Sequence, residues 1–218
     1  TKETITAPYL FPENLKDQQV LEPWVEATII VPPTYLNGLM KLFHRHEVVL
    51  ETTANFSHDR TALEVTLPLR ELMRNFFDEL KSLSSGFASL SYRLSASKPA
   101  AVVRLDVLIN DELVPAFSRI VAAGRVEEEA KAVAERLKEL LPRQLIIVKI
   151  QARALGRILA ARTISALRKD VTDYLYGGDI TRKMKLREKQ KKGKKKMQAR
   201  GRVEIPSEVF LKMVASEK

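Results

Sequence analysis

The sequence predicts an α+β protein with two domains. The first is a ferredoxin-like split βαβ domain over residues 22–98, and the second is an α+β domain over residues 99–218 that ends in a basic helical arm. Two observations predict this. Strand and helix periodicities follow one another in the order β-α-β-β-α-β within about 75 residues, which is the split βαβ plan. Positive charge is then concentrated near the C-terminus. The ferredoxin-like plan hosts many functions and implies none by itself.

The elements of the first domain follow from the spacing of its apolar residues. Residues 1–21 contain Pro8 and Pro12 and no sustained period, so we expect a linker or lead-in strand. Alternation over 25–31 predicts a strand, which Pro32-Pro33 ends. The elements predicted after it are a helix over 34–43, strands over 48–53 and 63–67, a helix over 72–80 closed by Gly86, and a strand over 87–94.

The second domain begins after a boundary near residues 95–99. A strand over 103–109 ends at the turn Asn110-Asp111, and 114–121 is its expected partner. Three glutamates open a helix over 127–140, where their charge suits the positive N-terminus, and Pro142 ends it. The remaining predicted elements are strands over 145–151 and 157–163 joined by a turn at Gly156, and an amphipathic helix over 164–175 that stops at Gly177-Gly178. The order of strands in this domain does not follow from pattern alone.

The distribution of charge indicates a polyanionic partner. The chain has a net charge of +10, and between Arg157 and Arg202 it has sixteen Lys or Arg against four Asp or Glu. The rest of the chain is close to neutral, so the excess positive charge is local. A basic block on a neutral body favours nucleic acid, with an anionic membrane surface or a solvated tail as the other interpretations.

The basic arm, residues 179–202, has few apolar residues of its own. Asp179 or Thr181 can cap a helix over 180–192, and Gly193 is expected to break it. The pair Gly177 and Gly178 is a candidate hinge. We expect the arm to be mobile when free and to order when a polyanion neutralises its charge. Because no aromatic or base-reading motif accompanies the charge, recognition should be of backbone and shape.

Several kinds of chemistry find no support in the sequence. Without cysteine there is no disulfide or thiolate site, and no apolar run is long enough to span a bilayer. There is no signal peptide, P-loop, Gly-x-Ser-x-Gly or His-Glu-x-x-His motif. His44 and His46 are interpreted as an exposed helix end and not as metal ligands. The chain opens at Thr1, and we expect a part of a longer protein or a processed product.

Seven segments resemble elongation factor 4, the LepA family of translational GTPases. They are LEPWVEATIIVPPTYLNGLMKL (21–42), FFDELKSLSSGFASLSY (76–92), VRLDVLIND (103–111), PRQ (142–144), ARTISALRKDV (161–171), YGGDITRKMKLREKQKKGKKKM (176–197) and VEIPSEVF (203–210). The sixth is highly specific, and the segments run in family order. The chain departs from the family pattern at 122–125, where Ala-Ala-Gly-Arg stands in place of the usual His-Arg, so no role of that histidine is carried over. Smaller departures occur at 150–156 and 173–176.

The resemblance implies a fold and a function. Residues 22 to about 100 are similar to the last domain of elongation factor G, and residues from about 101 to the family's own C-terminal domain. The family's GTPase and β-barrel domains would lie before Thr1, so GTP and Mg²⁺ are expected there and no cofactor in this chain. In the family, the C-terminal domain enters the ribosome beside the peptidyl transferase centre and contacts tRNA. Back-translocation, rescue of stalled ribosomes and ribosome assembly have each been proposed.

We therefore predict a ribosome- and tRNA-binding part of an elongation factor 4-like GTPase, with no catalysis of its own. The expected partners are the ribosome, tRNA and ribosomal RNA, and the expected state is a monomer in a bacterial cytoplasm or an organelle. The alternative is a peripheral membrane module that binds anionic lipid through the arm. The predicted phosphate contacts are Arg168, Lys169, Arg182, Lys183, Lys185, Arg187, Lys189, Lys191, Lys192, Lys194, Lys195 and Lys196.

Overall fold

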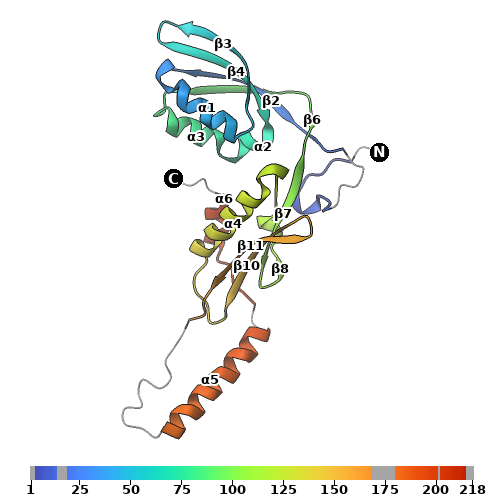
Figure 1. Ribbon diagram of the computed structural model, residues 1–218, viewed down its shortest axis with the longest axis vertical. Coiled ribbons are helices and arrows are strands. Elements are labelled where there is room, and N and C mark those ends of the chain that lie inside the picture. The colour runs from blue at the N-terminus through green and yellow to red at the C-terminus, as the bar shows by residue number, and fades with distance from the viewer. Residues whose placement is uncertain (1–2, 14–18, 168–179, 201, 215–218) are drawn as a thin grey trace. The chain divides into compact units, whose positions relative to one another are not determined.

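The computed structural model of the chain describes residues 3–13, 19–167, 180–200 and 202–214 (Figure 1). These residues fall into two compact units. One unit comprises residues 19–101. The other combines residues 3–13 with the described residues from Val102 onward, so the first unit is an insertion in the chain of the second.

The 19–101 unit is a four-stranded antiparallel sheet with its helices on one face (Figure 1). The strand order is β3-β4-β2-β5, which is that of a split βαβ fold, and the predicted β-α-β-β-α-β sequence of elements is confirmed. Its elements are β1 (Leu21–Glu22), β2 (Trp24–Val31), α1 (Leu36–Arg45), β3 (Val49–Ser57), β4 (Arg60–Pro68), α2 (Leu69–Glu71), α3 (Phe77–Leu83), β5 (Ser89–Leu94) and β6 (Lys98–Pro99).

Alternation along β2 explains how this unit forms its core. Val25, Ala27, Ile29 and Val31 are buried under the helices, and their neighbours in sequence point to the open face. The second helix is longer than the predicted 72–80. It runs from α2 through a π-helical turn, Leu72–Phe76, into α3, and Phe76 in that turn is completely buried.

The second unit has a five-stranded antiparallel sheet in the order β11-β10-β7-β8, with β9 also pairing with β7. Its elements are the 3₁₀ turn η1 (Pro8–Leu10), β7 (Val102–Ile109), β8 (Glu112–Leu113), the 3₁₀ turns η4 (Pro115–Phe117) and η5 (Ala123–Arg125), β9 (Arg119–Ala122), α4 (Val126–Leu140), β10 (Val148–Ala154), β11 (Arg157–Ile164), α5 (Ile180–Arg200) and α6 (Ser207–Val214).

Three predicted elements of this unit need correction. Of the partner strand expected at 114–121, only the part in β9 is a strand, because Pro115 starts a 3₁₀ turn; β9 does pair with β7, and the other short partner, β8, lies before the expected range. The strand expected at 145–151 begins only at Val148. The helix expected from Ile164 does not start there, since Ile164 ends β11 and residues 165–167 are not helical. The turn at Gly156 is confirmed, with positive φ at Leu155 and Gly156.

The core of the second unit lies between the sheet and α4, which packs on β7, β9, β10 and β11. Helix α6 was not predicted as an element, yet it belongs to this core. Val209 and Met213 are buried, and the Phe210 ring stacks on that of Phe117 at 4.9 Å between centroids. The segment after the basic arm is therefore part of the folded unit.

Residues 3–13 belong to the stretch that we expected to be a linker or a lead-in strand. They contain a 3₁₀ turn and no strand, and they pack within the second unit. Phe11 is buried, and the Arg104 guanidinium donates to the carbonyl oxygens of Tyr9, at 3.1 Å, and Phe11. Arg104 also pairs with Glu13 at 3.0 Å and with buried Asp106. A charged network on β7 thus fixes a segment nearly a hundred residues away in sequence.

Candidate nucleic-acid interface

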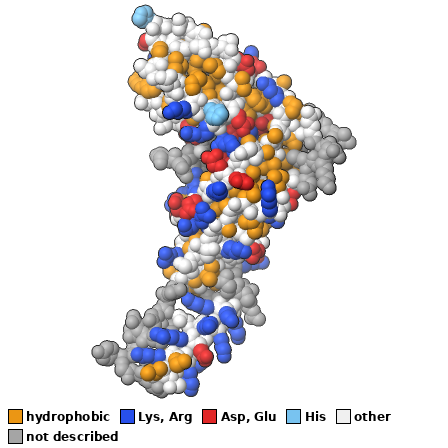
Figure 2. Space-filling model, in the orientation of Figure 1, with side chains coloured by type: hydrophobic (Ala, Val, Ile, Leu, Met, Phe, Trp, Pro, Cys, Tyr) orange, Lys and Arg blue, Asp and Glu red, His pale blue; other side chains and the backbone are white. Residues whose placement is uncertain are grey.

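Helix α5, Ile180–Arg200, contains most of the predicted phosphate contacts. At 1.5 Å per residue its 21 residues make a rod about 32 Å long. Over residues 180–196 its charged residues are one glutamate, Glu188, and ten cations: Arg182, Lys183, Lys185, Arg187, Lys189, Lys191, Lys192, Lys194, Lys195 and Lys196. Figure 2 shows this helix studded with Lys and Arg side chains.

These ten cations point to all sides of the helix. At 100° per residue, no half of the circumference is free of them. Ile180 and Met184 are 76% and 64% exposed, so residues 180–196 have no buried apolar face. Within that range, the side chains that are half-buried follow one line along the helix, and they are Lys183, Leu186, Gln190 and Lys194. The arrangement is that of a helix that meets its partner by charge and not by apolar packing.

The electrostatics of α5 oppose its own stability. Like charges stand four residues apart at Lys185 and Lys189, and again at Lys192 and Lys196. No acidic residue stands in the first turn, where one would favour the helix dipole. A polyanion would relieve this repulsion, so binding one should stabilise the helix.

Gly193 does not break the helix as we predicted. Helix α5 continues through it to Arg200, and a Cβ at this position would meet no atom within 4 Å. The four sites Arg168, Lys169, Gly177 and Gly178 lie outside the described residues. The structure therefore brings ten of the twelve predicted contacts onto one helix, and it does not test the hinge.

Gln144 joins the segments on either side of the arm. Its backbone carbonyl accepts from Leu167 N at 2.7 Å. Its side-chain Nε2 donates to Glu204 O at 2.6 Å, and its Oε1 accepts from Glu204 N at 3.2 Å. Sequence reasoning missed this residue, because a glutamine after a helix-ending proline gives no signal of its distant partners.

Two family models match the chain. One, elongation factor G C-terminus, covers residues 19–108, and the other, GTP-binding protein LepA C-terminus, covers residues 109–215. The two matches run in tandem without a gap. The chain belongs to the LepA family. It contains the C-terminal domains of a translational GTPase, as its resemblance implied. The first match ends inside β7, whereas the packing places β7 wholly in the second unit.

Several arginines elsewhere in the LepA region are paired with carboxylates. Arg153 lies 3.1 Å from Glu13, and Arg162 pairs with Glu135 across α4 and β11. The Glu135 carboxylate accepts from Lys138 and Arg162, and these bonds lower its pKa. The carboxylate partners balance the charge of these arginines, and the pairs stabilise the fold. In the described part of the chain, α5 is therefore the main concentration of positive charge.

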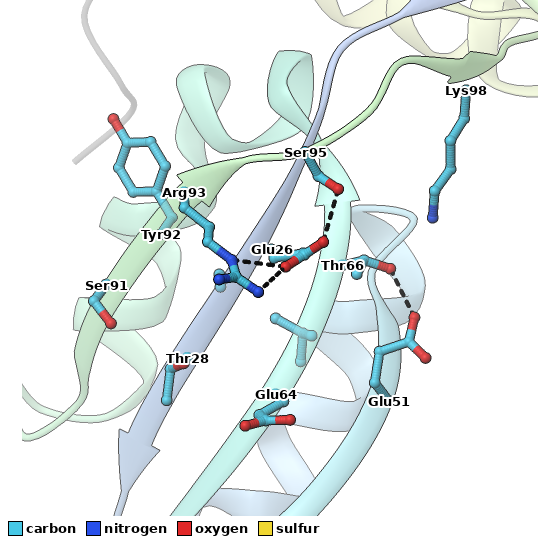
Figure 3. Close-up of a pocket in the computed structure, with 12 residues that line it drawn as sticks. Glu26, Thr28, Glu51, Glu64, Thr66, Ser91, Tyr92, Arg93, Ser95 and Lys98 are labelled. Atoms are coloured by element: carbon cyan, nitrogen blue, oxygen red, sulfur yellow. Dashed lines mark hydrogen bonds and ion pairs between the residues drawn. The ribbon is translucent and has the colours of Figure 1, made fainter.

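The open face of the 19–101 sheet has a shallow hollow of about 700 Å³ (Figure 3). Glu26 accepts from Ser95 Oγ and Arg93 Nε, both at 2.8 Å, and these bonds lower its pKa. Thr66 donates to Glu51 at 3.0 Å. The second cation of the hollow, Lys98, lies with its Nζ 4.1 Å from the centre of the Trp24 ring.

His46 is buried, so the expected exposed helix end is wrong for this residue. Its Nδ1 lies 2.9 Å from Glu71 Oε2, and its Nε2 lies 3.3 Å from Glu79 Oε1. Although His46 contacts both carboxylates, no group of three or more His, Asp or Glu side chains in the described ranges has an arrangement that could hold a metal ion. Nor do those ranges include a helix of the length and apolarity needed to cross a bilayer.

Proposed function

We propose that this LepA-family chain binds the ribosome and tRNA through its basic arm, which contacts the RNA backbone. In this proposal the chain has no catalysis of its own and acts in translation, in the cytoplasm or an organelle. GTP and Mg²⁺ would act at a GTPase domain of the parent protein. Back-translocation, rescue of stalled ribosomes and ribosome assembly would all use the same RNA contacts.

One observation supports this above the others: α5 presents ten cations and one carboxylate over residues 180–196 of an exposed rod. Lys and Arg side chains bind phosphates and release condensed counterions, which supplies affinity without base recognition. A helix with cations on all sides can contact phosphates from several strands at once, as a folded RNA presents them.

The membrane alternative receives less support. An amphipathic anchor needs an apolar face that enters the lipid, and α5 has cations around its whole circumference. Flotation with anionic liposomes tests this alternative. Protein that floats with the vesicles and stays there when tRNA is added would favour lipid.

The main experiment is filter binding of the 218-residue chain to tRNA over a salt series. Contacts with six to eight phosphates predict a slope of log K against log[salt] of about −4 to −7. A variant with Gln in place of Lys191, Lys192, Lys194, Lys195 and Lys196 should have a flatter slope. The expected change is roughly 0.7–0.9 for each phosphate that the variant no longer neutralises.

The matched control places Gln at five exposed cations outside the arm, namely Lys41, Arg60, Lys131, Arg143 and Arg157. Both variants change the net charge equally, so a difference between them reports the arm and not the overall charge. Equal slopes in the two variants would show that the arm does not contact the tRNA. No tRNA binding by the unmodified chain, together with no ribosome pelleting by the parent protein, would refute the proposed function.

A further inference from the structure

Segments from both sides of the basic arm meet at one residue of the second unit. Leu167, the last described residue before the arm, and Glu204, which follows it, both bond to Gln144. The side-chain amide of Gln144 pairs with the backbone N–H and C=O of Glu204, as a peptide group pairs across a sheet. Three hydrogen bonds at one residue thus join the described segments that precede and follow the arm.

The residue that holds them is itself fixed to the core. Leu141 and Ile146, on either side of Gln144, are 4% and 6% exposed. Pro142 stands two residues after the last residue of α4, so the helix cannot extend toward Gln144. Val203 and Ile205, on either side of Glu204, pack against the same core.

We propose that Gln144 is the positioning residue of the basic arm, a clip that fixes its base so that the cations on α5 meet RNA in one orientation. This inference rests on the proposed RNA binding by the arm. A pinned base reduces the number of arm directions that binding must select, which lowers the entropy cost of the complex. The Gln144 side chain is uncharged, so its hydrogen bonds should change the affinity for tRNA without changing the number of phosphates that the arm contacts.

The test uses Gln144→Ala, which keeps the backbone bond to Leu167 and removes both bonds to Glu204. In filter binding to tRNA, affinity should fall by about threefold to tenfold at fixed salt, because two hydrogen bonds no longer order the base. The slope against log[salt] should stay unchanged. Gln144→Glu, which can accept from Glu204 N but cannot donate to its carbonyl, should bind tRNA as weakly as Gln144→Ala or weaker.

The controls are Leu145→Ala and Glu204→Ala. Leu145 is the exposed neighbour of Gln144, and the clip uses only the backbone of Glu204, so neither change breaks it. Leu145→Ala should match the unmodified chain in affinity. Glu204→Ala should keep the slow amide exchange of residue 204, which Gln144→Ala should make faster.

Three results would overturn the clip. The first is an unchanged exchange rate at Glu204 in Gln144→Ala, and the second is equal tRNA affinity with faster exchange. Gln144→Ala that only lowers the unfolding midpoint, with affinity intact well below that midpoint, also contradicts a positioning role. If the unmodified chain binds no tRNA and the parent protein does not pellet with ribosomes, the proposed function fails, and the exchange rates alone then decide whether Gln144 fixes the arm.

Discussion

The imidazole of His46 and the carboxylate of Glu71 form a hydrogen-bonded pair that is almost completely buried. His46 Nδ1 donates to Glu71 Oε2 at 2.9 Å, and the two side chains are 3% and 1% exposed. Arg70 pairs with the other oxygen of Glu71, and it also contacts Glu22 and Glu47. The pair ties the end of α1 to the start of the second helix, so it holds the helical layer of the 19–101 unit together.

We predict that this pair makes the 19–101 unit sensitive to acid. Burial opposes ionisation of Glu71, but the bond from His46 and the charge of Arg70 outweigh it, so its pKa lies below the ordinary 4.5. Its contribution to stability is therefore full above pH 4.5 and is lost as pH falls through the lowered value. Glu71→Gln should destabilise the unit by about 1–3 kcal/mol at neutral pH and flatten its acid dependence.

Urea unfolding at a series of pH values measures this. Trp24 is the single tryptophan of the chain and lies in this unit, so its fluorescence follows the right transition. Glu139→Gln removes an exposed carboxylate on α4 and is the matched control. If both variants keep the acid dependence of the unmodified chain, Glu71 is not its source.

Local periodicity was enough to predict the order of the main elements of the 19–101 unit, although not the short pair of β1 and β6. Val25 to Val31 alternate without interruption, and Pro32-Pro33 ends the strand where the structure ends it. The buried state of His46 was not predictable in this way. Its partners Glu71 and Glu79 come from the other helix, and no pattern around His46 in the sequence indicates them.

The second unit was harder to predict, because contacts between distant residues leave no local pattern in the sequence. Residues 3–13 are held by Arg104, and the segment after the arm is held by Gln144 and by the packing of α6 on the core. These interactions join residues 60 to 95 positions apart, which periodicity cannot report. For the basic arm, composition predicted the cations, but the break predicted at Gly193 was wrong because propensity is only a weak guide.

Arg104→Ala should release residues 3–13 from the second unit. The change removes the donors to the Tyr9 and Phe11 carbonyls and the pairing with Glu13. Chymotrypsin can cut after Tyr9 and Leu10, and we expect cleavage there to be at least about tenfold faster. Arg157→Ala, an exposed arginine on β11, is the control and should be cut at the original rate.

Asp106→Ala, in the same network, should destabilise the second unit more than Arg104→Ala does. Asp106 is 1% exposed, accepts from Ser118 at 2.9 Å and pairs with Arg104. Removing one partner of a buried pair costs roughly 3–5 kcal/mol where the remaining charge is left uncompensated. Arg104 keeps Glu13 as a partner, so we expect the lower end of that range. Thermal unfolding followed by circular dichroism would show this. A decrease of less than about 1 kcal/mol, the contribution of one ordinary hydrogen bond, would mean that water replaces the carboxylate.

Two residues of helix α6 test whether the segment after the arm belongs to the core of the second unit or is an exposed tail. Met213 is buried and Leu211 is 72% exposed on the same helix. Met213→Ala should cost about 2–5 kcal/mol, whereas Leu211→Ala should stay within about 0.5 kcal/mol. Urea unfolding followed by far-ultraviolet circular dichroism measures both, with Trp24 fluorescence marking the other unit. Equal effects would show that α6 does not pack as described.

Gly193→Ala should strengthen the arm. The glycine lies inside α5 with open space around its Cα, and its φ is not in the left-handed region, so a methyl group fits without strain. Alanine is favoured over glycine in a helix by about 1 kcal/mol. We therefore expect more helix by circular dichroism.

We also expect tRNA affinity to rise by up to about fivefold, because a helix that is already formed no longer has to be ordered on binding. Gly193→Pro is the opposite change, and it should weaken both helix and binding. All three proteins have the same charge, so their salt slopes should agree while their affinities differ. If Gly193→Pro binds tRNA as tightly as Gly193→Ala, then the cations act as an unstructured cluster and the helical form of α5 is irrelevant to binding.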